Sequence, residues 1–458
     1  NSLMRSTMNV DLKNKKITVI GMGETGQGAS FLANKLGASV LLSESNSTAK
    51  ESFIKNAKNI GIKIENGGHT EKIYDSDLWI ISPGVSDEIN IVTNAKAKGI
   101  KIISEIEFAS WFTDKPIIGV TGSNGKTTTV SIINEILSKS EFNPKLTGNI
   151  GYAFSRAILE DLKNCPENRI YVIELSSYQL EHIETFKPFI SILLNISPDH
   201  LDRYKNMDKY LEAKMKIAMN HDSENHLLYN SDDKNITSHC KKLNTNKTTF
   251  GLMNDTQNAI KSDGSCIAID QTKIVDIDDL TLKGHHNLSN ILAAISAAKI
   301  LKVSNKVIRE ALINFNGIEH RLEKVSIIKG VAYYNDSKAT NIESVIAAIK
   351  SFNRPIILIL GGQDKNTDFS TLKPFLDKKI KQVVSYGSAS NKISTALRDA
   401  VALNAVFSLR DAVEECKKSA VSGDVVLLSP GCASFDQFDN FEHRGNEFKR
   451  IINEAAYA

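Results

Sequence analysis

The chain has 458 residues, of which 24% are charged and 41% hydrophobic, an ordinary composition for a soluble globular protein. Its 56 basic and 53 acidic residues leave a net charge of +3, which gives no case for a protein that binds nucleic acids or other polyanions by charge. The five cysteines are scattered without a C-x-x-C pair, and no apolar run approaches the ~20 residues of a membrane span. We therefore expect a cytoplasmic protein with about two to four domains.

Short apolar runs alternate with helical patterns along nearly the whole chain, which is typical of parallel sheets covered by helices. The expected strands cover residues 15–20, 38–44 and 78–85, then 116–120, 169–174 and 190–197, and finally 331–336, 355–362, 382–387 and 424–430. Residues 287–301 have a clear helical pattern, whereas the polar stretch from 221 to 283 is expected to form short strands and loops. The pattern predicts an α/β protein of three blocks, with boundaries near residues 105 and 318.

A G-x-G-x-x-G motif, residues 21–26, directly follows the first expected strand. Glu44 comes at roughly the distance where a dinucleotide-binding fold places the acid that contacts the ribose. By pattern alone, these features predict a nicotinamide- or flavin-dependent dehydrogenase. The same loop would hold any pyrophosphate, so a nucleotide sugar remains an alternative ligand.

A second glycine-rich loop follows the first strand of the middle block. Its residues are Gly122, Ser123, Asn124, Gly125, Lys126, Thr127 and Thr128. The glycines allow backbone N–H groups to surround an anion, and the following helix adds its dipole. Lys126 can then meet the outer phosphates, and a Thr127 or Thr128 hydroxyl can meet Mg²⁺. The spacing is a variant, G-x-x-G-K-T, because Val120 stands where the strict motif has glycine.

The ends of two further strands in this block also carry polar residues. Glu174 ends the strand at 169–174 and offers a hard oxygen ligand for Mg²⁺, and Asp199 and His200 follow the strand at 190–197. Each residue alone is more simply read as an ordinary loop residue. Because parallel strand ends share one edge of a sheet, the phosphate loop and these two strand ends together predict a single phosphate and metal site.

Lys214 lies on the apolar stripe of a helix together with Met207, Leu211 and Ala218. A lysine there usually extends its amine to solvent along the apolar surface. A partly buried amine can instead lose its proton and react with CO₂ to form a carbamate, an anion suited to a metal. Periodicity leaves both interpretations open.

The segments "TGSNGKTT", "ELSSYQLE", "PDHLDRY" and "EAKMKI" resemble the ATP-dependent Mur ligases, which build the peptide of bacterial cell-wall precursors. The motifs "YNDSKATN", "GGQDKNTDF" and "LLSPGCASFDQFDNFEHRGNEF" are similar to the D-glutamate-adding branch of that family. The resemblance spans all three blocks and is weakest in the first block and between residues 234 and 283.

The resemblance implies a Rossmann-like UDP-binding domain (1–104), a central ATPase domain (105–317) and a C-terminal Rossmann-like domain (318–458) that closes on ATP. The glycine loop then serves UDP, so the dehydrogenase signal is misleading. Residues implied to contact the UDP part of the substrate are Gly23, Glu24, Thr25, Glu44, Ser82, Pro83, Gly84 and Asn149.

The family reaction joins D-glutamate to UDP-N-acetylmuramoyl-L-alanine through an acyl phosphate made with ATP. By resemblance, Lys126 and one Mg²⁺, held by Thr127 or Thr128 and Glu174, bind the phosphates. A second Mg²⁺ is implied at His200 and carbamylated Lys214. The substrates are small molecules, and we expect a cytoplasmic monomer that has neither a nucleic-acid nor a membrane partner.

The remaining implied contacts belong mostly to the last block. Those implied for ATP are Asn287, Asn290, Arg321 and Asp336, with Lys338 beside the phosphates. Those implied for D-glutamate are Thr340, Lys365, Ser434, Phe435 and Phe441. The two asparagines could also cap a helix, which could coexist with binding, and the two phenylalanines could equally pack in the core. A nucleotide sensor without catalysis is a third hypothesis, and the complete metal and phosphate set argues against it.

Overall fold

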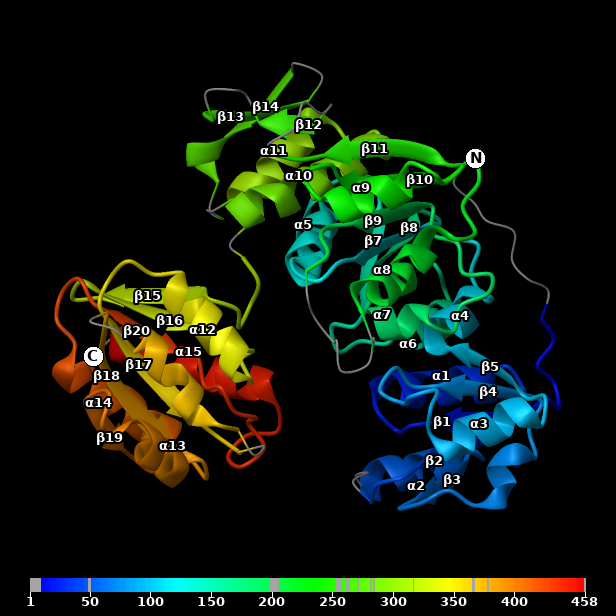
Figure 1. Cartoon of the computed structure of the whole chain (residues 1–458), viewed down its shortest axis with the longest axis horizontal. Helices are drawn as coiled ribbons and strands as arrows, with labels where there is room; N and C mark the ends of the chain where they lie inside the picture. Colours follow the sequence, from blue (N-terminus) through cyan, green and yellow to red (C-terminus); the bar gives the residue numbers. More distant parts are fainter. Residues whose placement is uncertain are drawn as a thin grey trace. The chain divides into compact units, whose positions relative to one another are not determined.

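The structure is a computed structural model. It describes residues 10–47, 51–197, 204, 206–252, 258–260, 264–269, 272–280, 282, 285–315, 317–364, 367–376 and 379–456. These residues form two compact units that divide after Phe315. The first unit contains two sheets and the second contains one (Figure 1). The α/β class expected from the sequence is confirmed.

The first sheet has five parallel strands in the order β3-β2-β1-β4-β5. Its elements are β1 (Lys16–Ile20), α1 (Glu24–Lys35), β2 (Ser39–Glu44), α2 (Glu51–Asn59), β3 (Lys63–Asn66), η1 (Glu71–Tyr74), β4 (Leu78–Ile81), α3 (Asn90–Ala97) and β5 (Lys101–Ser104). The chain runs outward from β1 to β3 and then crosses to β4 on the other side. The strand order therefore reverses beside β1, where α/β sheets bind their ligands.

The second sheet has nine strands in the order β14-β13-β12-β11-β10-β9-β6-β8-β7. Its strands are β6 (Ile117–Thr121), β7 (Asn143–Gly148), β8 (Arg169–Glu174), β9 (Ile190–Leu193), β10 (His226–Asn230), β11 (Asn246–Phe250), β12 (Asn258–Ile260), β13 (Cys266–Ile269) and β14 (Thr272–Asp276). Its helices are α4 (Glu105–Ser110), α5 (Lys126–Ser138), α6 (Phe154–Asp161), α7 (Ser177–Leu180), α8 (Met207–Met215), η2 (Lys216–Ala218), α9 (Lys234–Cys240), η3 (Ile277–Asp279), α10 (His285–Ile300) and α11 (Asn305–Asn314). Strand β6 pairs with β8 on one side and β9 on the other, so the order again reverses beside it.

The polar stretch from residue 221 to 283 contains more regular structure than the sequence predicts. Besides short strands it holds the seven-residue helix α9, whose first N–H groups at Asn235 and Ile236 donate to the Asp233 side chain. A helix of two turns is too short for its apolar period to be recognised, so the expectation of strands and loops alone was wrong here.

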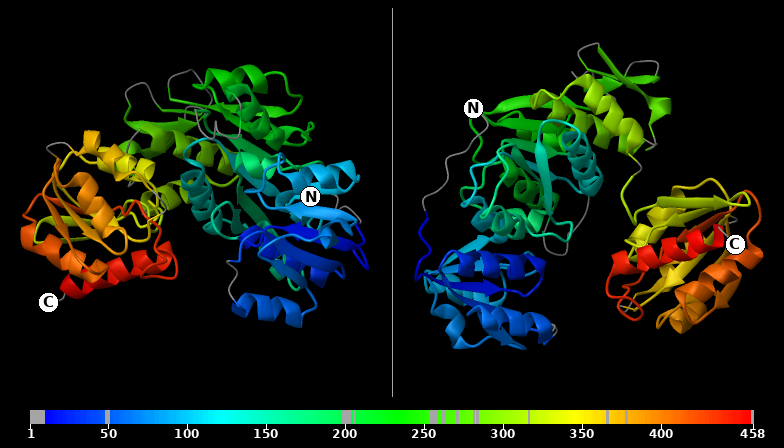
Figure 2. Two further views of the ribbon diagram at one scale, coloured as in Figure 1. Left: turned by 60° about the horizontal axis from the view of Figure 1, so that its bottom comes forward. Right: turned by 180° about the vertical axis from the view of Figure 1, so that it is seen from behind.

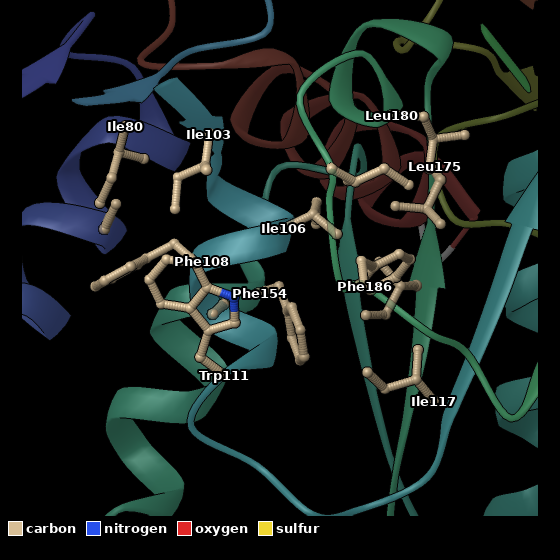
Figure 3. Close-up of a cluster of buried hydrophobic side chains, with 14 of the residues drawn as sticks. Ile80, Ile103, Ile106, Phe108, Trp111, Ile117, Phe154, Leu175, Leu180 and Phe186 are labelled. Atoms are coloured by element: carbon tan, nitrogen blue, oxygen red, sulfur yellow. The ribbon is translucent and has the colours of Figure 1, made fainter. Parts of the chain in front are cut away.

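The two sheets of the first unit share one hydrophobic core. Figure 3 shows this core, in which Ile80 and Ile103 of the first sheet join Phe108 of α4, Ile117 of the second sheet, and Leu175 directly after its strand β8. Helix α4 starts directly after β5, so a single short helix carries the core from one sheet to the next.

The second unit is a six-stranded sheet in the order β15-β16-β20-β17-β18-β19, parallel except for β15. Its elements are β15 (Glu323–Ile328), β16 (Val331–Asn335), α12 (Ile342–Lys350), β17 (Ile356–Gly361), η4 (Phe369–Phe375), β18 (Ile380–Tyr386), α13 (Ser390–Leu397), β19 (Leu403–Ala405), α14 (Leu409–Ser419), β20 (Val425–Leu428) and α15 (Phe441–Ala456). Along β17, Ile356, Leu358 and Leu360 pack with α12 and α13, whereas Ile357 and Ile359 pack with α14 and α15 (Figures 1 and 2). The alternation puts helices on both faces.

The cysteines are all free thiols. Cys240 and Cys266 are buried in the first unit, Cys416 and Cys432 are buried in the second, and Cys165 is partly exposed. Among the described residues, no helix is both long and apolar enough to cross a membrane.

Candidate active site

The phosphate loop lies at the end of β6, and α5 begins at its Lys126. Gly125 immediately precedes the helix with φ of +84°, a left-handed conformation that favours glycine. A Cβ atom on Gly125 would lie 2.2 Å from Asn290 Oδ1 of α10, so a side chain here would force Asn290 to move. Lys126 Nζ donates to the carbonyl oxygens of Gly122 (2.8 Å) and Ser123 (3.0 Å), which holds the amine over its own loop.

The end of β8 brings Glu174 against this loop. Thr127 Oγ1 donates a 2.7 Å hydrogen bond to Glu174 Oε2, and Asn149 Nδ2 donates to Glu174 Oε1 at 3.2 Å. Glu174 is only 3% exposed. The strand-end prediction therefore places Glu174 correctly beside the loop, and the contact selects Thr127 over Thr128 as its hydroxyl partner.

The end of β9 is joined to the loop by residues that the sequence analysis did not single out. Asn195 and Asn124 exchange two hydrogen bonds, with Asn124 N donating to Asn195 Oδ1 (2.8 Å) and Asn195 Nδ2 donating to Asn124 O (2.9 Å). Ser197 N donates to Ser123 Oγ at 3.0 Å. Asn195 and Ser197 both follow β9, so their position at a third strand end could have identified them from the sequence. The predicted ligand His200, with its neighbour Asp199, lies outside the described residues.

Lys214 is 1% exposed, which confirms that its helical position faces the interior. Its Nζ donates to Gly122 O at 3.1 Å and lies 4.6 Å from the centre of the Tyr210 ring. Tyr210 OH in turn lies 3.2 Å from Ser123 Oγ. The lysine is not an amine extended to solvent, because it contacts the phosphate loop from within the core.

The residues present fit a Mg²⁺ ion. Thr127 and Glu174 offer hydroxyl and carboxylate oxygens at one point, the hard donors that this ion prefers. Within the described part of the chain, no group of three or more His, Cys, Asp or Glu side chains forms a further metal cluster. Mg²⁺ commonly keeps several waters and takes phosphate oxygens besides its protein ligands.

The loops after β1 and β4 lie together at the reversal point of the first sheet. Gly21 N donates to Ser43 O, and Ser82 N donates to Ile20 O, both at 2.9 Å. Glu44 Oε2 accepts from Met22 N at 2.9 Å, so this acid holds the glycine loop itself. Partial burial of Glu44 opposes ionisation, but hydrogen bonds from Asn46, Met22 and Ser45 lower its pKa overall. The predicted UDP segments of the first sheet thus share one edge.

Three predicted residues have surroundings that the sequence did not predict. The Glu24 side chain forms an ion pair with Arg156 of α6 rather than extending over the glycine loop. Asn287 and Asn290 lie inside α10, which begins at His285, so helix capping does not explain them. Asn290 is buried and packs on the phosphate loop.

In the second unit, Arg321 and Asp336 lie on adjoining segments. Arg321 is exposed between His320 and Leu322, whose φ angles of +63° and +45° are strained for residues with side chains. Leu322 N donates to Asp336 Oδ1 at 3.1 Å, and Lys338 N donates to His320 O at 3.0 Å. Burial raises the pKa of Asp336 to about 6, despite hydrogen bonds to its carboxylate.

Two of the residues predicted for D-glutamate lie on loops after neighbouring strands. Thr340 follows β16 and Ser434 follows β20, and these strands are paired. Phe441 opens α15, with Lys338 Nζ 5.9 Å from its ring centre. Phe435 is 64% exposed, so core packing does not explain it. Lys365 lies outside the described residues.

A buried arginine that the sequence analysis missed joins these loops. Arg444 is 0% exposed and donates to Ser337 Oγ (2.9 Å) and O (2.8 Å) and to the carbonyls of Cys432 (3.1 Å) and Ala433 (3.2 Å). All four acceptors belong to the loops after β16 and β20. Only its place in a motif quoted for the resemblance pointed to it.

Three family profiles match the chain. The MurD N-terminal domain matches residues 16–91, the Mur ligase middle domain matches 120–298, and the Mur ligase glutamate ligase domain matches 320–432. The first match covers the glycine loop and so favours a Mur-ligase interpretation of it over a nicotinamide one.

Similar proteins agree with the profiles. The UDP-N-acetylmuramoylalanine–D-glutamate ligase of Christiangramia forsetii is 40% identical over 446 residues, 96% of this chain and 99% of the relative. That of Clostridioides difficile is 38% identical over 453 residues, 97% of this chain and 99% of the relative.

A solved UDP-N-acetylmuramate–alanine ligase from Thermotoga maritima, 19% identical, covers 96% of this chain and all of its own with a TM-score of 0.59. That likeness shows the fold and confirms the expected three-domain α/β architecture. The chain belongs to the Mur ligase family, in the branch of the UDP-N-acetylmuramoylalanine–D-glutamate ligases.

Proposed function

We propose that this chain joins D-glutamate to UDP-N-acetylmuramoyl-L-alanine at the expense of ATP, in the cytoplasmic synthesis of peptidoglycan precursors. The carboxylate of the alanyl group attacks the terminal phosphorus of ATP, and ADP leaves. The amine of D-glutamate then attacks the acyl phosphate, loses a proton and displaces phosphate. Full-length similarity to ligases of that name supports the choice of substrates.

One observation carries the catalytic part of the proposal, namely the assembly of three strand ends around one phosphate loop. The loop after β6 contacts Glu174 at the end of β8 and Asn195 beyond β9, and Lys214 reaches it from α8. Two anions must approach each other in this reaction, and fixed positive groups lower that repulsion. Lys126 is positioned for this role because its amine lies over the loop.

We assign Thr127 and Glu174 to one Mg²⁺, and His200 with a carbamate on Lys214 to a second. Bound Mg²⁺ would neutralise phosphate charge and orient the terminal phosphate. The position of the Lys214 amine against the phosphate loop supports this assignment. Carbamate formation joins CO₂ to the neutral amine nitrogen, with loss of one proton.

The substrate assignments follow the same family relation. We propose residues 1–104 for the UDP substrate, 105–317 for ATP and 318–458 for D-glutamate and further nucleotide contacts. The adjacency of the loops after β1 and β4 supports the first assignment. The paired strands before Thr340 and Ser434 support the last.

Phosphate release from ATP tests the function. We expect release that requires both UDP-N-acetylmuramoyl-L-alanine and D-glutamate. Release with L-glutamate in place of D-glutamate would retain the mechanism and overturn the specificity. No release with either amino acid would overturn the proposed ligase activity, and binding of NADH would then revive the dehydrogenase hypothesis.

A further inference from the structure

Helix α1 of the first sheet packs directly on the start of α6 in the second. Each helix adjoins a segment that the family resemblance implies to contact the diphosphate of the UDP substrate. Helix α1 begins inside the glycine motif, residues 21–26, and α6 follows Asn149 by a few residues. The contact between the two helices therefore determines how far apart these two segments lie.

The guanidinium group of Arg156 is the centre of this contact. Its Nε lies 2.5 Å from Glu24 Oε1, its second arm donates to Gln27 Oε1 at 3.3 Å, and the group lies 5.9 Å from the centre of the Phe31 ring. Residues 24, 27 and 31 share one face of α1, because helical neighbours recur every three or four positions. One side chain of α6 thus contacts three side chains on one face of α1.

Gly28 lies on the same face and lets the helices approach closely. A Cβ atom there would lie 2.5 Å from Ser155 Oγ, 3.1 Å from Ala153 Cβ and 3.2 Å from Arg156 Cγ. The two helices therefore pack closely, because Gly28 has no side chain to keep the first turn of α6 away from α1.

The charge of Glu24 has a separate consequence. It is the first residue of α1, so its carboxylate stands at the helix end where an anionic ligand is expected. An unpaired carboxylate there would repel a diphosphate. In this chain the carboxylate is turned to Arg156, which neutralises it.

We infer that Glu24 and Arg156 are positioning residues for the nucleotide substrate. Their ion pair joins the two diphosphate segments across the domain boundary and removes the negative charge of Glu24 from the anion site. The inference rests on the proposed function for the identity of the nucleotide. The pair is partly exposed, at 36% for Glu24 and 30% for Arg156, so its contribution to folding stability is small.

Steady-state kinetics of the full chain separate positioning from stability. In Glu24→Gln and Arg156→Gln, the KM for UDP-N-acetylmuramoyl-L-alanine should rise about five- to tenfold, because misplaced binding groups weaken affinity. The kcat and the KM values for ATP and D-glutamate should stay within about twofold of wild type. The double variant Glu24→Arg/Arg156→Glu should restore much of the affinity for the nucleotide by reversing the pair.

Two further variants complete the design. Gly28→Ala keeps both charges but forces the helices apart, and it should raise the same KM. Glu135→Gln is the matched control. It breaks the Lys139–Glu135 pair on α5, whose side chains are 32% and 35% exposed, and should leave every kinetic parameter unchanged.

Unchanged nucleotide KM in both single variants would overturn the inference while leaving the ligase activity standing. Failure of the charge-reversed pair to restore affinity would also overturn it, because Arg156 would then act alone. A purely structural role would lower kcat in proportion to folded protein and leave KM unchanged. If the wild type shows no ligase turnover, calorimetric binding of UDP-N-acetylmuramoyl-L-alanine to the same variants decides the inference independently.

Discussion

Thr127 Oγ1 lies 2.7 Å from Glu174 Oε2, although 47 residues separate them in the chain. This hydrogen bond joins the first turn of α5 to the end of β8. It holds a hydroxyl and a carboxylate at one point before any ion arrives, which reduces the ordering that metal binding would otherwise require.

Thr127→Val should therefore weaken the response to Mg²⁺. Valine keeps the shape of threonine and removes its oxygen, so we expect the Mg²⁺ concentration for half-maximal phosphate release to rise roughly 10- to 100-fold. Thr129→Val is a matched control, since Thr129 Oγ1 is buried and has no hydrogen-bond partner among the described residues. Equal Mg²⁺ responses in the two variants would exclude Thr127 from the metal site.

Lys214→Ala should abolish ligation and leave the fold intact. The change removes the amine that reaches the phosphate loop, and we expect a loss of about 1,000-fold or more in kcat. Lys214→Met keeps the packing volume and should be equally inactive, which separates chemistry from cavity formation. The control Lys216→Ala, two residues further along the chain, should stay active. Near-normal turnover in either Lys214 variant would remove the carbamate from the mechanism.

Glu105 should make stability depend on pH. Burial raises its pKa to about 7, well above the ordinary 4.5 of glutamate. Between these values the folded state holds a proton that the unfolded state has lost. The free energy of unfolding should therefore fall by about 3 kcal/mol as pH rises through this window and then level off.

Glu105→Gln should remove that dependence, because an amide does not titrate. The measurement is urea unfolding of both proteins from pH 5 to pH 8, with Glu135→Gln as a partly exposed control. Parallel curves for wild type and Glu105→Gln would contradict the prediction.

Arg444→Lys should destabilise the second unit. A lysine has one nitrogen and cannot reach acceptors on two loops at once, so buried carbonyl groups lose their donors. We expect a cost of about 2–4 kcal/mol in unfolding free energy and a higher KM for D-glutamate. Arg450→Lys, in an exposed pair, should change stability by no more than about 1 kcal/mol. A small effect of Arg444→Lys would show that the loops hold their shape without it.

The phosphate loop and Glu174 could be predicted from the sequence because strand ends converge by the geometry of parallel sheets. Lys214 could be placed inward because its helix has a clear apolar period. In each case a local pattern and one rule of topology were sufficient.

The contacts of Glu24 and Asn290 could not be predicted in this way. Glu24 meets Arg156 across 132 residues, and Asn290 meets Gly125 through the packing of two helices. Such pairs depend on how whole elements dock, and a single sequence carries no local trace of it. The same limit hid Arg444, since nothing in its helix marks it as buried.

The buried thiols give each unit a chemical reporter of its own. Burial raises the pKa of Cys240 and of Cys432 to about 12, so both react with alkylating agents only when the surrounding structure opens. One of these thiols belongs to each unit, and the partly exposed Cys165 supplies an internal reference for reagent activity. Mass spectrometry of the unaltered enzyme can therefore follow the rates at which both units open, in one experiment. A substrate that slows alkylation of only one of these two thiols would reveal which unit it stabilises.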